Sequence, residues 1–154
     1  MITLKEGNKA PDFELKDQNE NKVKLSSFKG KKVVLYFYPK DDTPGCTKEA
    51  CDFRDNISKL KQKNVVVLGV SNDNLESHKK FSKKYNLNFS SLSDVDKKVS
   101  KKYGVYEEKE KFGHKYMGIT RSTFLIDENG KIEKIFYKVN PEEHIYEIMA
   151  EISK

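Results

Sequence analysis

The sequence predicts an α/β sandwich in which helices flank a central mixed β-sheet. Two continuous apolar runs, residues 33–38 and 65–70, have the length and composition of fully buried strands, and a helical segment follows each of them. Two later strand-like runs flank residues 127–130, a turn that ends in Asn-Gly and is typical of a β-hairpin. Strands that alternate with helices pair in parallel and a hairpin pairs antiparallel, so the sheet is expected to be mixed.

The first part of the chain predicts a short hairpin followed by a buried strand. Residues 13–15 and 23–25 are apolar-polar alternating segments on either side of a polar turn at 17–21. The strand at 33–38 is expected to end at Pro39, because proline lacks the N–H that a central strand needs.

The elements after the first strand follow from helix and turn signals. A helix is expected over 46–63, with Thr43 as its N-cap and Pro44 in the first helical position. Apolar residues then recur at helical spacing before Tyr85, Gly104 is a C-cap signal, and Pro141 is a helix-start signal. The remaining elements are expected as a strand at 65–70, helices at 74–85 and 96–103, strands at 91–93, 122–126 and 132–136, and a helix from 141 to about 152.

Length and charge narrow the class of protein. A chain of 154 residues is large enough for a hydrophobic core without disulfides, and residues 1–154 are expected to form one domain. No apolar run is long enough to span a membrane and the N-terminus lacks a secretory h-region, which predicts a cytoplasmic protein. The net charge is +6, but 28 of the 30 basic residues are lysines that are interleaved with acids along the chain. A solvated surface is therefore favoured over a nucleic-acid site, which would be expected to use arginine.

Cys46 is the first candidate functional residue. It follows a strand end and falls in the first turn of the expected helix, where unpaired N–H groups and the helix dipole favour a thiolate, the nucleophilic form of cysteine. Gly45 has no Cβ and is expected to leave room for a small substrate beside the sulfur. The Thr43 hydroxyl is expected either to accept from the Cys46 N–H or to turn toward the sulfur. The alternative is a buried, inert cysteine, since free cysteines are among the most buried residues.

Cys51 is the second cysteine, and its spacing has a mechanical consequence. Five residues of ideal helix separate the two Cα atoms by roughly 8–9 Å, whereas a disulfide needs them within about 7 Å. A Cys46–Cys51 disulfide would therefore require the helix between them to unwind. The spacing also differs from the CxxC of a thioredoxin-type dithiol. The alternative is that Cys51 is a core residue on the apolar helix face with Phe53.

Arg121 is the third candidate. Only Arg54 and Arg121 are arginines in a lysine-rich chain, so a retained guanidinium suggests a need for its planar fork. Arg121 directly precedes the strand at 122–126 and should therefore lie at one end of the strands of the sheet. Which end this is depends on the direction of that strand. Beside Cys46 its charge would favour the thiolate. The alternative is a surface arginine in a loop.

Other groupings predict no metal site. His78, His114 and His144 lack any CxxC or HxxxH spacing with the two cysteines, so ordinary surface or helix-face histidines are favoured over zinc ligands. Residues 112–118 contain no phosphate-binding pattern and are expected to form a mobile loop beside the site.

Three stretches of the chain together match the pattern of one enzyme family. They are Phe-Tyr-Pro through Thr-Pro-Gly-Cys-Thr at 37–47 with Cys51 and Phe-Arg-Asp after it, the opening at 7–13, and the arginine-containing stretch at 118–127. On these residues the chain resembles the peroxiredoxins, and most closely the bacterioferritin-comigratory, or Q-type, subfamily. The likeness covers nearly the whole chain and implies a thioredoxin-like fold.

The resemblance assigns a role to each candidate. It implies that Cys46 is the peroxidatic cysteine, which attacks the peroxide and becomes a sulfenic acid. Thr43 and Arg121 would hold and polarise the peroxide, and Pro39 would shield the pocket. Cys51 lies where part of this subfamily carries its resolving cysteine, which condenses with the sulfenic acid to an intramolecular disulfide.

The resemblance also implies substrates and partners. It implies a thiol peroxidase that reduces hydrogen peroxide and small organic hydroperoxides in antioxidant defence and is recycled by a thioredoxin-like reductant. No metal or prosthetic group, nucleic acid or membrane is implied. No cysteine follows Cys51, so exchange across a dimer is not expected, and the protein should be a monomer or weak homodimer.

Two other functions remain open on the residues alone. A thiol–disulfide oxidoreductase or metal-delivery protein of the same fold is disfavoured, because its dithiol would need closer spacing than Cys46 and Cys51. A basic nucleic-acid-binding module would show steep, salt-dependent retention on DNA.

Overall fold

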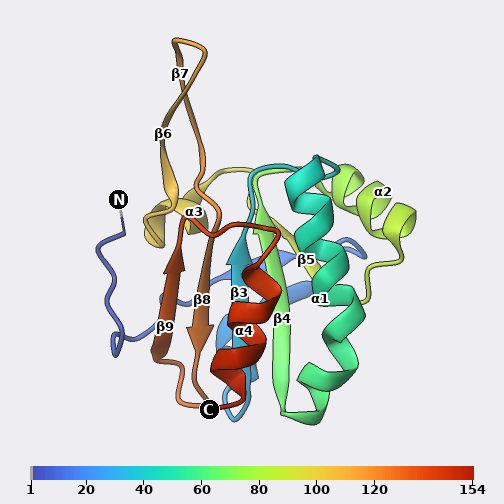
Figure 1. The fold of residues 1–154 in the computed structure, drawn as a ribbon, viewed down its shortest axis with the longest axis vertical. Helices are drawn as coiled ribbons and strands as arrows, with labels where there is room; N and C mark the ends of the chain where they lie inside the picture. The colour runs from blue at the N-terminus through green and yellow to red at the C-terminus, as the bar shows by residue number, and fades with distance from the viewer. Residues whose placement is uncertain (1) are drawn as a thin grey trace.

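A five-stranded mixed sheet forms the centre of the protein. The structure is a computed structural model that describes residues 2–154. The strand order is β5-β4-β3-β8-β9. The strands are β3 (Lys32–Phe37), β4 (Val65–Ser71), β5 (Ser90–Ser93), β8 (Ser122–Ile126) and β9 (Ile132–Tyr137). Strands β3, β4 and β5 run parallel, while β8 is antiparallel to both β3 and β9 (Figure 1). The predicted mixed α/β sandwich is confirmed.

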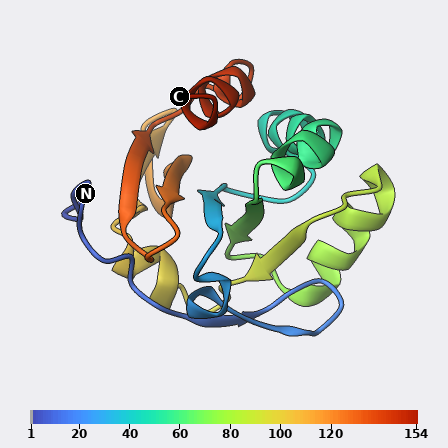
Figure 2. The same ribbon diagram turned by 90° about the horizontal axis from the view of Figure 1, so that it is seen from below.

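Helices lie on both sides of this sheet. The helices α1 (Pro44–Gln62) and α4 (His144–Ile152) cover one face together, as Figure 2 shows. The short helix α3 (Lys98–Lys102) and the β1–β2 hairpin lie on the other face. The helix α2 (Leu75–Tyr85) packs beside the edge strand β5, and its Phe81 joins the same apolar cluster as α1.

The alternation of side chains along β3 divides the core into two layers. Val34 and Tyr36 point toward α1 and α4, and Tyr36 stacks on Phe53 of α1 with ring centroids 4.7 Å apart. Leu35 and Phe37 point into the opposite cluster. Because both faces of β3 are covered, its residues read as one apolar run in the sequence instead of an alternating one.

Several element boundaries differ from the expected ones at their ends. The first hairpin pairs β1 (Glu14–Lys16) with β2 (Lys22–Lys24), so each strand is shifted by one residue toward the turn relative to the expected segments. A 3₁₀ turn (Leu25–Phe28) follows. The helix α1 begins at Pro44, the expected first helical position, and ends at Gln62, one residue before the expected end. The final helix begins at His144 and not at Pro141, which lies in the preceding turn.

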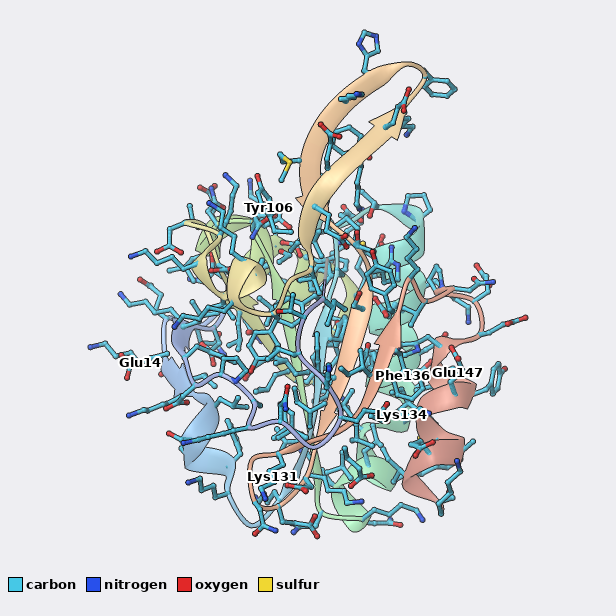
Figure 3. All side chains as sticks on the ribbon, turned by 90° about the vertical axis from the view of Figure 1, so that its left-hand side faces the viewer. Glu14, Tyr106, Lys131, Lys134, Phe136 and Glu147 are labelled. Atoms are coloured by element: carbon cyan, nitrogen blue, oxygen red, sulfur yellow. The ribbon has the colours of Figure 1, made fainter. Side chains whose placement is uncertain are left out.

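The expected loop at 112–118 is instead part of a second hairpin. Strands β6 (Tyr106–Lys111) and β7 (His114–Ile119) pair antiparallel around Phe112 and Gly113, which both have positive φ, as a type I′ turn requires. Figures 1 and 3 show this hairpin standing away from the sheet, with Tyr106 at its base. Both faces of its outer part are exposed, so the sequence carries no apolar alternation there.

The helices were compared with the length and hydropathy of membrane-spanning segments. Within residues 2–154, no helix combines the length and the apolar character that crossing a bilayer requires.

Candidate active site

Cys46 lies where the carboxyl end of β3 meets the first turn of α1. Thr43 is the N-cap, with extended backbone angles, and the first helical bond runs from the Thr47 N–H to the Thr43 carbonyl at 2.8 Å. Pro44 occupies the start of the helix, where its missing N–H removes no helical bond. Cys46 is a free thiol and only 1% exposed. The placement predicted from the strand and cap signals therefore holds, and only a small molecule can approach this sulfur without movement of the chain.

The Thr43 side chain does not cap the helix. Its hydroxyl donates to the Lys40 carbonyl at 2.8 Å, and it makes no bond to a first-turn N–H. The expected bond from the Cys46 N–H to this hydroxyl is not formed, because the loop orients the hydroxyl toward the Lys40 carbonyl and away from the first turn. The positive end of α1 has no side-chain cap as a result and stays available to an anion beside Cys46.

Arg121 reaches Cys46 because of the direction of β8. Ser122 pairs with Phe37 in the antiparallel register, so the residue before Ser122 lies at the carboxyl end of β3. The Arg121 Nη2 group donates to the Cys46 sulfur at 3.3 Å, and its side chain is only 14% exposed. Arg121 is thus not a surface arginine. Its positive charge beside the sulfur favours the thiolate form of the cysteine.

Glu49 is a site residue that the sequence reasoning missed. Its Oε1 accepts from the Arg121 Nη1 at 2.7 Å, so the two ends of one guanidinium fork hold Glu49 and Cys46. Glu49 is buried, and its Oε2 has no hydrogen-bond partner among the described residues. Its position three residues after Cys46 places both on one helix face. That spacing, with an acid on a face that is otherwise apolar, is the signal that was available.

The burial of Glu49 changes its titration. Burial raises the pKa of this carboxyl from 4.5 to about 7, even though the Arg121 charge and hydrogen bond lower it. The carboxyl therefore changes charge near neutral pH, which few carboxyl groups do.

Glu49→Gln is expected to gain stability relative to the wild type as the pH rises. The pKa of Glu49 is higher in the folded than in the unfolded chain, so its stabilising contribution is complete below about pH 4.5 and lost as pH rises through about 7. Glutamine has no such loss. The unfolding free energy of Glu49→Gln minus that of the wild type should therefore rise by about 3 kcal/mol between pH 4.5 and pH 8. Urea unfolding at both pH values measures it.

The matched control for this experiment is Glu128→Gln, at an exposed turn position. The pH-dependent gain should be larger for Glu49→Gln than for this replacement of an exposed carboxyl group. Equal pH slopes for both variants would contradict the raised pKa of Glu49.

Gly45 makes room for Arg121 and not for substrate. A Cβ on Gly45 would lie 3.0 Å from Arg121 Nη2 and 3.2 Å from Pro141 Cγ, both closer than ordinary contact. The absence of a side chain at Gly45 therefore allows the guanidinium to approach the first turn of α1. The expectation that this space receives the substrate is corrected accordingly.

Gly45→Ala is expected to slow the oxidation of Cys46 without unfolding the protein. The new methyl group must displace Arg121 by a few tenths of an ångström, which lengthens its contact with the sulfur. Since a misplacement of 1 Å costs about 100-fold, we expect a loss of roughly 3- to 10-fold in the rate constant with hydrogen peroxide. Stopped-flow fluorescence or a competition assay measures this constant. Gly118→Ala, whose Cβ would meet its nearest neighbour at 3.5 Å, should match the wild type.

Cys51 and Pro39 lie on either side of the first turn. Cys51 is a half-buried free thiol in α1, outside the apolar cluster that contains Phe53, and burial raises its pKa. The helix is continuous between the two cysteines, so they are not bonded and keep the helical separation. Pro39 is half-buried in the bend between β3 and α1.

Lys109 adds a second cation that the sequence reasoning did not find. It extends from β6 and donates its Nζ to the Ile119 carbonyl, two residues before Arg121. Burial and the Arg121 charge lower the pKa of Lys109, while the Cys46 charge raises it. The residue escaped notice because no element was predicted over residues 106–111, where the side chains carry no apolar alternation.

Two of the three histidines are buried and not on the surface. His78 and His144 are fully buried, whereas His114 is exposed on β7. His144 Nε2 lies 2.6 Å from the Thr123 hydroxyl. Both residues lie on helix faces, which is one of the two placements expected from the sequence, and hydrogen bonds satisfy their ring nitrogens in the interior.

Comparison with known proteins gives one consistent result. The AhpC/TSA family pattern matches residues 7–135. A putative peroxiredoxin bcp of Coxiella burnetii is 50% identical over 151 residues, which cover 98% of this chain and 100% of that protein. A cysteine-to-serine variant of PrxQ from Xylella fastidiosa superimposes with a TM-score of 0.94 at 31% identity, over 99% of this chain and 98% of that chain.

A second solved structure agrees. The bacterioferritin comigratory protein of Xanthomonas campestris, studied for its alkyl peroxide reduction activity, superimposes with a TM-score of 0.87 at 33% identity, over 92% of this chain and 90% of that chain. The fold, the family match and these relatives therefore agree: the chain belongs to the AhpC/TSA family, and within it to the Bcp and Q-type peroxiredoxins, thiol peroxidases of thioredoxin-like fold.

Proposed function

We propose that Cys46 is the peroxidatic cysteine of this thiol peroxidase. Its thiolate attacks the terminal oxygen of a hydroperoxide, so an S–O bond forms and the O–O bond breaks. The sulfur is oxidised by two electrons to a sulfenic acid, and the alkoxide or hydroxide leaves and takes up a proton. The Arg121 fork, which donates to Cys46 at 3.3 Å and to Glu49 at 2.7 Å, is the observation that carries this proposal.

The surrounding residues would act on the peroxide. The Arg121 guanidinium would stabilise the negative charge that develops as the O–O bond lengthens, together with the uncapped start of α1. Glu49 would keep the guanidinium in one orientation, because it holds the other end of the fork. Thr43 would contribute its hydroxyl after leaving the Lys40 carbonyl, and Pro39 would limit the access of water.

Cys51 would be the resolving cysteine. Its sulfur attacks the sulfur of the Cys46 sulfenic acid, an S–S bond forms, and water leaves. A dithiol of the thioredoxin type would then reduce this disulfide. The continuous helix between the two cysteines means that α1 must unwind locally before the bond can form.

The proposed substrates are hydrogen peroxide and small organic hydroperoxides. The 1% exposure of Cys46 favours small molecules, and the related Xanthomonas protein was studied for alkyl peroxide reduction. A role in antioxidant defence follows from this chemistry. A single domain over residues 1–154, a monomeric or weakly dimeric state and a cytoplasmic location stay predictions.

One mass-spectrometric experiment tests this proposal. The reduced protein is mixed with one equivalent of hydrogen peroxide without reductant and digested with trypsin. The expected product has lost two hydrogen atoms through a bond between Cys46 and Cys51. An unchanged mass would contradict the peroxidase assignment of Cys46, and a stable sulfenic acid on Cys46 would contradict the resolving role of Cys51. The predicted absence of nucleic-acid binding is tested by retention on DNA at low salt.

A further inference from the structure

The helix α2 and its flanking residues contact the chain on both sides of the two cysteines. Before Cys46, the loop between β3 and α1 carries Asp41 and Asp42, and both bond to α2. After Cys51, Arg54 bonds to the last residue of α2. The segment that lies between these contacts is the one that must unwind for a disulfide to form.

The first contact is a buried ion pair. The Asp41 carboxylate lies 2.6 Å from His78 Nδ1, and it accepts hydroxyl groups from Ser77 at 2.8 Å and Tyr38 at 2.7 Å. His78 Nε2 lies 2.9 Å from the Leu92 carbonyl. The side chains of His78 and Asp41 are 0% and 2% exposed. The loop that leads into α1 is thus attached to the interior of the protein and not only to its surface.

The acceptors around His78 determine its charge. The Leu92 carbonyl can only accept, so Nε2 must carry a proton. Asp41 accepts hydrogen bonds from two hydroxyl groups and lies 2.6 Å from Nδ1. Burial lowers the pKa of His78, but the hydrogen bond and charge of Asp41 outweigh it and the pKa is raised. The raised pKa favours the protonated form of His78, which donates from both ring nitrogens.

The same cluster does not suit a metal ion. Ligand atoms of Asp41, Asp73 and His78 lie within 4.8 Å of one another. Both ring nitrogens of His78 nevertheless already donate to protein oxygens, and the Asp73 Oδ2 accepts from the Asp41 N–H and the Ser71 hydroxyl. These bonds give the cluster a structural use, which is to hold the loop.

The other two contacts are at the C-terminal end of α2. The Asp42 carboxylate accepts from the Lys84 ammonium at 2.8 Å and from the Tyr85 hydroxyl at 2.9 Å. The Tyr85 carbonyl accepts from Arg54 Nη1 at 2.7 Å. Arg54 lies three residues beyond Cys51, less than one helical turn away.

From these contacts we infer that α2 is a clamp which confines the unwinding of α1 to residues 44–53, and that His78 is a positioning residue for the oxidation of Cys46. This inference rests on the proposed Cys46–Cys51 disulfide. The clamp keeps residues 41 and 42 in place while the first turns open, so that Cys46 can return to Arg121 after reduction. Without it, the loop would loosen together with the helix.

Hydrogen exchange of the reduced and disulfide forms, followed by mass spectrometry of peptides, tests the clamp. In the wild type, oxidation should raise exchange within 44–53 and leave 38–43 and 54–60 unchanged. In His78→Gln the increase should extend into 38–43. Lys84→Met with Tyr85→Phe removes only the exposed bonds to Asp42, so it is expected to fold and to show a smaller extension into the same residues. Lys80→Met is the control, because within residues 2–154 the ion pair of Lys80 is with Glu76 on the same helix, and it should match the wild type.

The kinetic steps separate positioning from general destabilisation. His78→Gln should slow the oxidation of Cys46 by at least about tenfold, because the loop before α1 no longer holds the sulfur against Arg121. The later formation of the disulfide should be as fast as in the wild type or faster, because unwinding is easier. Equal slowing of both steps would overturn the clamp and leave the peroxidase proposal intact. An exchange pattern like that of the wild type in both α2 variants, His78→Gln and Lys84→Met with Tyr85→Phe, would do the same. A wild type that forms no Cys46–Cys51 disulfide would overturn both.

Discussion

Cys46→Ser is expected to abolish peroxide consumption, whereas Cys51→Ser is expected to leave the first oxidation of the protein intact. In the proposed mechanism the Cys46 thiolate is the nucleophile, and a serine hydroxyl in the same position does not ionise at neutral pH. In the proposed mechanism, the Cys51 sulfur acts only after the sulfenic acid has formed. Its loss should therefore impair turnover with a thioredoxin-type reductant and not the reaction with the first equivalent of peroxide.

Two measurements separate these outcomes. Peroxide consumption is followed in a coupled thioredoxin assay, and the sulfenic acid is trapped with dimedone and located by mass spectrometry. Dimedone should label Cys46 in the Cys51→Ser variant and label nothing in Cys46→Ser. Full peroxidase activity in Cys46→Ser would refute the proposed function. Full turnover in Cys51→Ser would show that another thiol, for example that of the reductant, resolves the sulfenic acid directly.

Arg121→Met is expected to give the second-largest loss, about 100- to 1,000-fold in the rate constant for oxidation of Cys46. A loss of this size is typical when an enzyme loses one preorganised hydrogen-bond donor to the charge that develops in the transition state, and Arg121 is such a donor in the proposed mechanism. Arg121→Lys should lose only about tenfold, because an ammonium keeps the charge but cannot contact Glu49 and Cys46 with two ends of a fork. Stopped-flow measurement with hydrogen peroxide gives the rate constants of the wild type and of both variants.

The stability of the variants needs its own control. Removal of Arg121 leaves the Glu49 carboxyl buried without its partner, and this alone destabilises the fold. Arg121→Met combined with Glu49→Gln avoids the unpaired carboxylate, so its kinetic loss reports on the guanidinium. Thermal unfolding of each variant identifies any that are not folded at the assay temperature. A double variant as active as the wild type would contradict the role of Arg121.

Much of the fold could be predicted because its strands are buried on both faces. The runs at 33–38 and 65–70 are continuous apolar segments, and such segments form parallel strands beneath helices. The β6–β7 hairpin could not be recognised in the same way. Most of its side chains face solvent on both sides, and its turn is Phe112-Gly113 instead of the Asn-Gly that marks most such turns.

In the site, too, features that depend on neighbouring residues could be predicted, and features that depend on distant residues could not. The position of Cys46 could be predicted because Pro39, Thr43 and Pro44 act on neighbouring residues, and local signals of this kind survive in any fold. The hydroxyl of Thr43 could not be placed, since its choice between the Lys40 carbonyl and the first-turn N–H groups depends on how the loop closes. The role of Glu49 and the pairing of His78 with Asp41 were missed because their partners, Arg121 and Asp41, are distant in the chain.

By itself, the sequence determined the order along the chain of the five central strands and the helices, the thiol at the start of α1, and the five-residue spacing that prevents Cys46 and Cys51 from bonding in an intact helix. All of these depend on the chemistry of residues within a few positions of one another. Only the tertiary structure decided that Arg121 faces Cys46, because the antiparallel pairing of β8 with β3 sets which end of the sheet it reaches. It also decided that Glu49 and His78 are buried with charged partners, since such pairing results from packing between elements far apart in the chain.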